Sequence, residues 1–193
     1  MKILFISLGC DKNLADSEEM LGLLTGNGHE IVDSEEEADA IVINTCCFIH
    51  DAKEESVNTI LEMAEYKKTG TCKILIVTGC MAQRYKEEIT EEIPEVDAVL
   101  GTTSYGDIVK ALNEAEAGHV FREFKDINAL PEDSGRRVIT TGGHFGYLKI
   151  AEGCDKHCTY CIIPSLRGKF RSVPEERLLK QAEYMASQGV REL

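Results

Sequence analysis

Short apolar runs alternate with longer amphipathic stretches through residues 1–120. Runs such as KILFISL and KILIVT are rich in Ile, Leu and Val, as expected of strands buried on both faces of a parallel sheet. The pattern predicts strands over 2–8, 38–44, 73–78 and 96–100, and helices over 16–25, 51–68, 82–92 and 105–117. Strands that alternate with helices predict an α/β fold whose open parallel sheet is flanked by helices.

The alternation stops where Gly, Pro, Asn and Ser become frequent. We therefore predict a first domain over 1–124, a linker over 125–143 and a second domain from 144 to 193. The second domain is predicted to contain a strand over 144–151, a helix over 174–189 and the start of another strand over 190–193. So few elements cannot close a sheet, so we expect the second domain to be truncated.

Charge is distributed unevenly along the chain. Residues 1–135 carry 11 Lys and Arg against 28 Asp and Glu, whereas residues 136–193 carry 10 against 6. An acidic first part repels a phosphate backbone and favours basic partners, although solvated helix faces are the commoner explanation. No apolar run approaches the ~20 residues that span a bilayer, and the N-terminus lacks the regions of a signal peptide. We expect a cytoplasmic protein with no membrane partner.

Three of the eight cysteines form a compact C-x3-C-x2-C motif at Cys154, Cys158 and Cys161. Three thiolates in one loop can hold an iron–sulfur cluster, and three ligands on a four-iron cube leave one iron open to a substrate atom. A structural zinc site with His157 as the fourth ligand is an alternative, as is a disulfide with one thiol left over.

Three other cysteines each follow a predicted strand. Cys10, Cys46 and Cys80 end the segments ISLGC, VINTC and IVTGC, one strand–helix unit apart. The carboxyl ends of parallel strands meet at one edge of a sheet, so these thiols are predicted to converge on a second cluster. A glycine before Cys10 and Cys80 permits a tight turn there. The alternative is three buried structural cysteines, and Cys47 and Cys72 do not fit the pattern.

The C-x3-C-x2-C motif resembles that of the radical S-adenosylmethionine superfamily, as does the IIPSLRG segment that follows it. In that superfamily an aromatic residue linked to the adenine of the cofactor precedes the third cysteine; Tyr160 has this place, or is simply a half-buried aromatic. With SLGCDKNLADSE at Cys10, NTC at Cys46 and TGCMAQR at Cys80, the whole chain resembles the methylthiotransferases. The first of these segments favours the branch that modifies a ribosomal protein. Cys47 departs from the family, which more often has a small residue there.

The resemblance implies two [4Fe–4S] clusters with S-adenosylmethionine bound beside Tyr160. The implied cluster ligands form two sets: Cys10, Cys46 and Cys80 for the auxiliary cluster, and Cys154, Cys158 and Cys161 for the cluster that cleaves S-adenosylmethionine. The implied reaction adds a methylthio group to the β-carbon of an aspartate in a small-subunit ribosomal protein, by way of a 5′-deoxyadenosyl radical.

The same resemblance implies an electron donor such as flavodoxin or ferredoxin. Residues 144–193 would begin a partial TIM-type barrel, so this chain alone is expected to be inactive. The alternatives are a methylthiotransferase that acts on tRNA adenosine and a noncatalytic iron–sulfur redox module.

Overall fold

The structure, a computed structural model, describes residues 1–132 and 134–193. Six parallel strands form an open sheet in the order β2-β1-β3-β4-β5-β6. Their bounds are β1 (Lys2–Ser7), β2 (Glu30–Val32), β3 (Ala40–Thr45), β4 (Ile74–Gly79), β5 (Ala98–Leu100) and β6 (Phe121–Glu123). The chain steps from β1 outward to β2 and then continues from β3 in the opposite direction. The topological switch point therefore lies between β1 and β3, and the predicted α/β class is confirmed.

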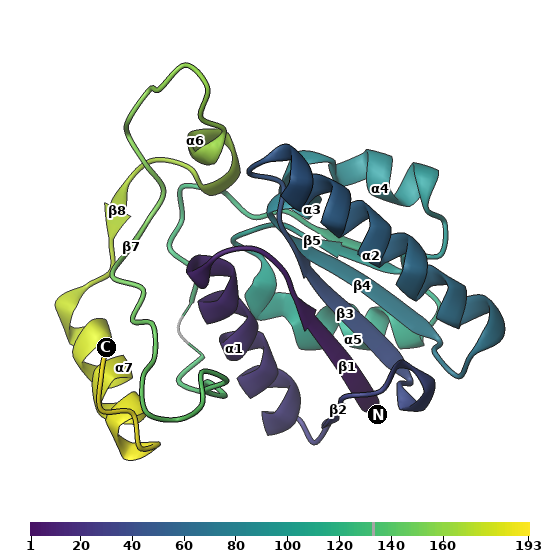
Figure 1. Ribbon diagram of the computed structural model, residues 1–193, viewed down its shortest axis with the longest axis horizontal. Coiled ribbons are helices and arrows are strands. Elements are labelled where there is room, and N and C mark those ends of the chain that lie inside the picture. The colour runs from purple at the N-terminus through teal and green to yellow at the C-terminus, as the bar shows by residue number, and fades with distance from the viewer. Residues whose placement is uncertain (133) are drawn as a thin grey trace.

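Helices cover both faces of this sheet (Figure 1). One face is covered by α1 (Asp11–Gly26) and α5 (Ile108–Glu116), and the other by α2 (His50–Thr69), α3 (Cys80–Arg84) and α4 (Lys86–Glu92). Two short 3-10 helices, η1 (Glu35–Glu37) and η2 (Tyr105–Asp107), lie in the connections. This arrangement gives two separate apolar layers, as expected for a sheet covered on both sides.

Every residue of β3 and β4 is buried, which explains their continuous apolar sequences. Side chains alternate between the two layers: Ile41 and Ile43 pack with α2, whereas Ala40 and Val42 pack with α1 and α5. Burial of each large aliphatic side chain contributes about 1.5–3 kcal/mol. These two strands therefore form a rigid centre of the sheet. The residues that directly follow their carboxyl ends are held in fixed positions.

The structure corrects several predicted boundaries. Strands β2 and β6 were not predicted, because each has only three residues and polar neighbours. The helix predicted over 82–92 is two helices, α3 and α4, which meet at Tyr85 with φ −116° and ψ 34°. Helix α1 begins at Asp11, five residues before the predicted start, with Cys10 at its N-cap.

Residues 144–193 contain little regular structure apart from two helices. Strand β7 (Ala151–Glu152) pairs antiparallel with β8 (Arg171–Ser172), and α6 (Ile163–Arg167) and α7 (Glu175–Ser187) complete the region. The strand predicted over 144–151 is wrong in extent, because only its last residue belongs to a strand. Near the start of the predicted strand, Phe145 forms an isolated parallel β-bridge with Glu192, which follows α7 in the sequence.

The predicted linker packs against α1. The described residues between 125 and 143 contain no helix or strand. They are nevertheless held to the first region, residues 1–124, as distinct from the second region, residues 144–193. Val138 N–H donates to the Glu18 carbonyl at 3.0 Å, and the Arg137 guanidinium donates to the Glu18 carboxylate. The segment is thus fixed on the first region, and the domain boundaries at 124 and 143 stay predictions.

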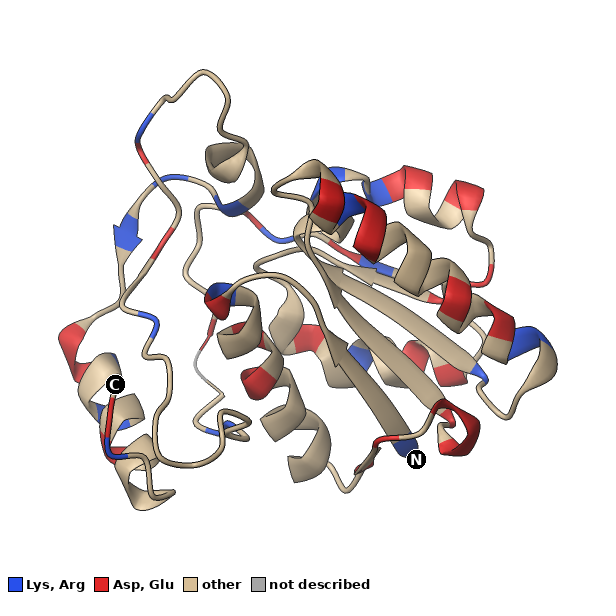
Figure 2. Cartoon of the chain, viewed as in Figure 1, with Lys and Arg blue, Asp and Glu red and all other residues tan. Residues whose placement is uncertain are grey.

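Acidic side chains gather on the helices of the first region, most visibly along α2 and α4 (Figure 2). Blue and red positions are mixed more evenly in the loops around β7 and β8. The charge division seen in the sequence is therefore also a division in space. Within the described part of the chain, no helix has both the length and the apolar character to cross a bilayer.

Candidate metal centres

The structure brings Cys10, Cys46 and Cys80 together at the carboxyl edge of the sheet. Cys10 lies at the N-cap of α1 after β1, Cys46 follows the last residue of β3, and Cys80 is the first residue of α3 after β4. All three line one pocket of about 920 Å³. The pocket lies beside the switch point between β1 and β3, where open α/β sheets characteristically bind their ligands.

Two glycines allow the chain to turn beside these thiols. Gly9 and Gly79 have φ values of +95° and +93°, a region that side-chain-bearing residues rarely adopt. A Cβ atom on Gly9 would lie 2.7 Å from Cys46 Cβ, and one on Gly79 would lie 2.6 Å from the Thr45 carbonyl oxygen. Glycine is therefore needed for the backbone conformation, as the predicted tight turn implies, and also for the close approach of neighbouring strand ends.

The three thiols differ in exposure. Cys10 is exposed, whereas Cys46 and Cys80 are buried. Burial raises the pKa of Cys80 to about 12, and the nearby Arg167 guanidinium opposes that shift. Metal ligation needs the thiolate, so a cation beside Cys80 favours the form that can bind a metal.

Asn13 cross-links the loops that follow β1 and β3. Its buried Nδ2 donates to the Leu8 carbonyl at 3.0 Å and to the Thr45 carbonyl at 2.9 Å. Its Oδ1 accepts from Arg167 Nη2 at 2.6 Å and lies 3.7 Å from Cys80 Sγ. In the sequence, Asn13 stands out only as one residue of the SLGCDKNLADSE segment, and the polar residues at helical spacing in that segment were the available signal.

The polar side of α1 is buried, so the explanation of acidic residues as solvated helix faces does not hold for this helix. The buried polar residues of this helix are Asn13, Asp16, Ser17, Glu18 and Glu19. Two of the carboxylates pair with cations from later in the chain: Lys149 and Arg167 of the second region pair with Asp16, and Arg137 of the segment over 125–143 pairs with Glu18. Charges of opposite sign from the two regions therefore meet away from water.

Glu152, on β7, joins the same network. It lies 2.8 Å from Lys149 Nζ and 3.2 Å from Arg167 Nη1. Burial raises its pKa, but the two cations outweigh burial and lower the pKa to about 2. Glu152 is therefore ionised at neutral pH and binds the cations that also hold Asp16.

The second cysteine set lies on the loop over 153–162. Cys154 and Cys161 are partly buried and Cys158 is exposed. The loop is anchored at its start by a bond from Cys154 N–H to the Gly168 carbonyl at 3.0 Å, and Cys161 N–H donates to the Cys158 carbonyl at 3.0 Å. Gly153 at the base of this loop lines the same pocket as the first set.

Neither set is arranged to chelate one ion. In the described part of the chain, no three Cys, His, Asp or Glu side chains are close enough together to hold a single metal ion. The thiolates of an iron–sulfur cluster bind different iron atoms, so they need not converge on one point. Three thiols around one roomy pocket fit a cluster in their donor chemistry and in the space between them.

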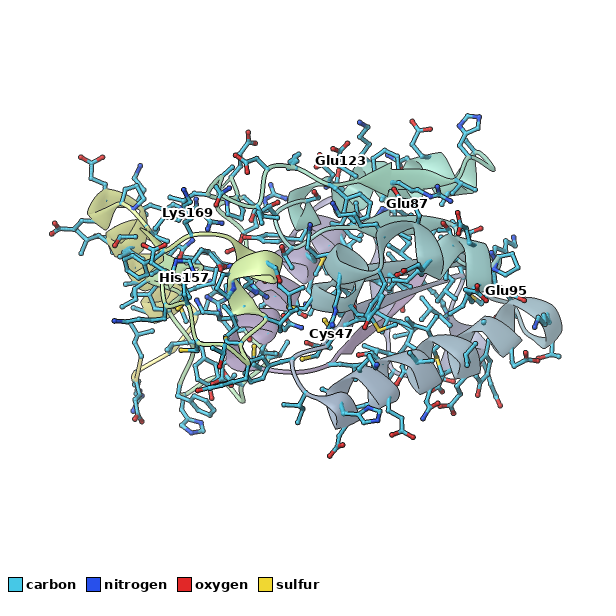
Figure 3. The ribbon with its side chains drawn as sticks, turned by 90° about the horizontal axis from the view of Figure 1, so that it is seen from above. Cys47, Glu87, Glu95, Glu123, His157 and Lys169 are labelled. Carbon is cyan, nitrogen blue, oxygen red and sulfur yellow. The ribbon has the colours of Figure 1, made fainter. Side chains whose placement is uncertain are left out.

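Tyr160, His157 and Cys47 lie in different surroundings. Tyr160 is 87% exposed, so the interpretation of it as a half-buried packing residue is wrong. His157 is exposed on the same loop, whereas Cys47 lies near the start of α2 (Figure 3). Cys47 is buried, and its thiol donates to the Cys80 carbonyl at 3.3 Å. All eight cysteines are free thiols.

Comparison with known sequences fits this geometry. The model of a protein family described as "Uncharacterized protein family UPF0004" matches residues 2–101, which is more than half of the chain. The chain belongs to this family. The match covers the sheet from β1 to β5, and with it all three cysteines of the first set.

Curated relatives match over the whole chain. A protein of Lachnoclostridium phytofermentans named "Ribosomal protein uS12 methylthiotransferase RimO" is 64% identical over 193 residues, which are 100% of this chain and 44% of that protein. Proteins with the same name from Clostridioides difficile and Acetivibrio thermocellus are 51% and 49% identical, again over 100% of this chain and 44% of theirs. The resemblance to the methylthiotransferases is confirmed, and the chain spans less than half the length of these relatives.

Proposed function

We propose that the protein carrying this chain is a radical S-adenosylmethionine methylthiotransferase. Its proposed substrate is ribosomal protein uS12 of the small subunit, modified at the β-carbon of an aspartate. The observation that carries the proposal is the pocket beside the switch point, which is lined by three strand-end cysteines and by the base of the C-x3-C-x2-C loop. Relatives up to 64% identical that carry the uS12 methylthiotransferase name support the same substrate.

The two cysteine sets have separate proposed roles. Cys10, Cys46 and Cys80 would hold the auxiliary [4Fe–4S] cluster. Cys154, Cys158 and Cys161 would hold the second [4Fe–4S] cluster, at which S-adenosylmethionine binds. When bound, these groups supply a 5′-deoxyadenosyl radical and the sulfur that is transferred, which is chemistry that no protein side chain provides.

The chain's own residues would bind, orient and shield these groups. Apolar side chains form part of the pocket wall, namely Leu8, Phe48, Ile49, Ile163 and Leu166. Such a wall excludes water from a reactive intermediate and so limits side reactions. Lys12 and Arg167 add positive charge to the same wall, which suits a site whose own cysteine ligands are anionic thiolates.

Tyr160 and the acidic helices have proposed roles in binding the cofactor and the substrate protein. The exposed Tyr160 ring is free to stack on the adenine of S-adenosylmethionine. The acidic surface along α2 and α4 favours a basic ribosomal protein over a phosphate backbone (Figure 2). Electrons would come from a flavodoxin or ferredoxin, and the reaction would take place in the cytoplasm.

The test is an assay of the anaerobically reconstituted full-length protein with S-adenosylmethionine, a reductant and purified uS12. We expect release of 5′-deoxyadenosine together with a methylthio group on one aspartate, found by mass spectrometry of uS12 peptides. A Cys158→Ala variant should abolish release, and a Cys46→Ala variant should retain release but lose sulfur transfer. Modification of tRNA adenosine instead of uS12, or stable clusters that never yield 5′-deoxyadenosine, would contradict the proposal.

A further inference from the structure

Arg167 occupies the junction of the two cysteine sets. It is the last residue of α6, six positions after Cys161, and its side chain is only 6% exposed. It lines the pocket together with Cys80. A buried guanidinium at this place needs an explanation, because removing such a charge from water is costly unless it is paired.

The partners of Arg167 come from both regions of the molecule. Its Nη1 lies 2.9 Å from Asp16 Oδ2 and 3.2 Å from Glu152 Oε1, and its Nη2 donates to Asn13 Oδ1 at 2.6 Å. Asn13 and Asp16 are on the first turns of α1, the helix that begins directly after Cys10. The planar fork of an arginine can satisfy such partners at fixed angles, whereas a lysine ammonium is a rotatable point charge.

The same network secures both ends of the second cysteine loop. Glu152 lies two residues before Cys154, and Arg167 lies six residues after Cys161. Lys149 pairs with both Asp16 and Glu152, and Lys12 Nζ donates to the Ala151 carbonyl at 2.6 Å. The loop over 153–162 is therefore held to α1 on both sides, although its own backbone has few internal bonds.

We propose that Arg167 is a positioning residue for both candidate clusters: its guanidinium fork locks the loop over 153–162 onto α1 and places a positive charge beside Cys80. This inference rests on the proposed function, because it assumes that both cysteine sets hold clusters. Its two components, the fork and the charge, have separate consequences. The fork fixes where one cluster lies relative to the other, and the charge favours the reduced, more negative state of the auxiliary cluster.

The test compares Arg167→Met and Arg167→Lys with wild type in the reconstituted full-length protein. Potentials are measured by EPR-monitored redox titration in a background with Cys154, Cys158 and Cys161 changed to Ala, so that only the auxiliary cluster gives a signal. Relative position is measured as the dipolar coupling between the two reduced clusters when all six cysteines are present. Arg137→Lys is the matched control, because Arg137 is equally buried and also pairs with α1, through Glu18, but does not line the pocket.

Arg167→Met is expected to lower the potential of the auxiliary cluster and to change the dipolar coupling. Arg167→Lys retains the charge, so it should keep the potential near the wild-type value while still changing the coupling. Arg137→Lys should change neither quantity. If Arg167→Met is too unstable to purify, the coupling in Arg167→Lys decides the question.

If the Arg167 variants have the wild-type potential of the auxiliary cluster and the wild-type dipolar coupling between the clusters, the inference is overturned. The proposed function would remain intact. Equal changes in Arg137→Lys would also overturn it, because they would show a general effect of loosening the two regions. Wild-type protein that binds no clusters would overturn the inference and the proposed function together.

Discussion

The two cysteine sets of this chain are positioned by different means. Cys10, Cys46 and Cys80 lie 36 and 34 residues apart in sequence, and the sheet brings them together because they follow three adjacent parallel strands, β1, β3 and β4. Cys154, Cys158 and Cys161 lie within eight residues, on a loop between the two-residue strand β7 and the short helix α6. The first set is therefore placed by the core of the fold, and the second by its short spacing and by contacts at the ends of its loop.

Helix α1 connects these two arrangements. Its N-cap is a cysteine of the first set, and its buried carboxylates pair with cations from the region that carries the second set. A set placed by the core should tolerate changes in the other region, whereas a loop held by ion pairs should depend on them.

Removing the Asp16 carboxylate is expected to have the largest effect on stability. Asp16→Ala leaves Lys149 and Arg167 buried with one partner fewer, and breaking a buried pair in this way costs about 3–5 kcal/mol. Urea unfolding of the metal-free protein measures the loss. Glu62→Ala, which changes an exposed carboxylate on α2, should leave the free energy of unfolding unchanged. Similar small effects of both variants would show that the two regions are not joined by this network.

Acid should weaken the contact between the regions through Glu152. The pKa of Glu152 in the folded protein is about 2, below its ordinary value of 4.5, so its ionised form stabilises the fold. That contribution is fully present above pH 4.5, falls as the pH drops towards 2, and amounts to about 3 kcal/mol. Glu152→Gln should therefore be less stable than wild type at pH 7, and the difference should shrink as the pH falls from about 4.5. A difference that stays constant down to pH 2 would contradict the ion-pair account.

A single methyl group at Gly79 should disturb the first set more than its size suggests. The positive φ of Gly79 is strained for alanine, and the new Cβ would meet the Thr45 carbonyl oxygen at 2.6 Å. We expect Gly79→Ala to destabilise the protein by about 3 kcal/mol and Gly28→Ala by about 1 kcal/mol. Gly28 is the control because its φ is +84° but a Cβ there would meet nothing within 4 Å. Equal losses in thermal unfolding would show that the strand ends are not closely packed at Cys80.

The sequence predicted the central part of the fold well, for a physical reason. Strands β3 and β4 are buried on both faces, so their apolar runs are continuous and easily recognised. Strands β2 and β6 have three residues each at the edges of the sheet, where burial imposes no such pattern. The strand predicted over 144–151 is wrong in extent because an apolar segment forms a strand only beside a neighbouring strand. In this segment only Phe145 and Ala151 pair with residues of another segment.

The candidate site was predictable in its thiols but not in its charges. The strand-end position of Cys10, Cys46 and Cys80 follows from topology, which the alternating pattern reveals. The burial of Asp16 and Glu18 could not be inferred from α1 alone, because their partners lie more than 100 residues away in sequence. A long-range ion pair has no local signature, so an acidic helix face was interpreted as solvated.

We propose two independent sets of three thiolates, each of which holds its own cluster. Iron and sulfide analysis of the anaerobically reconstituted full-length protein, with Cys46→Ala and Cys158→Ala measured beside wild type, tests it most directly. Each variant should lose about half of the iron, and Mössbauer spectra of the remainder should show an intact four-iron cluster at the unaltered set. Wild-type iron content in either variant, or loss of all iron in both, would contradict the account.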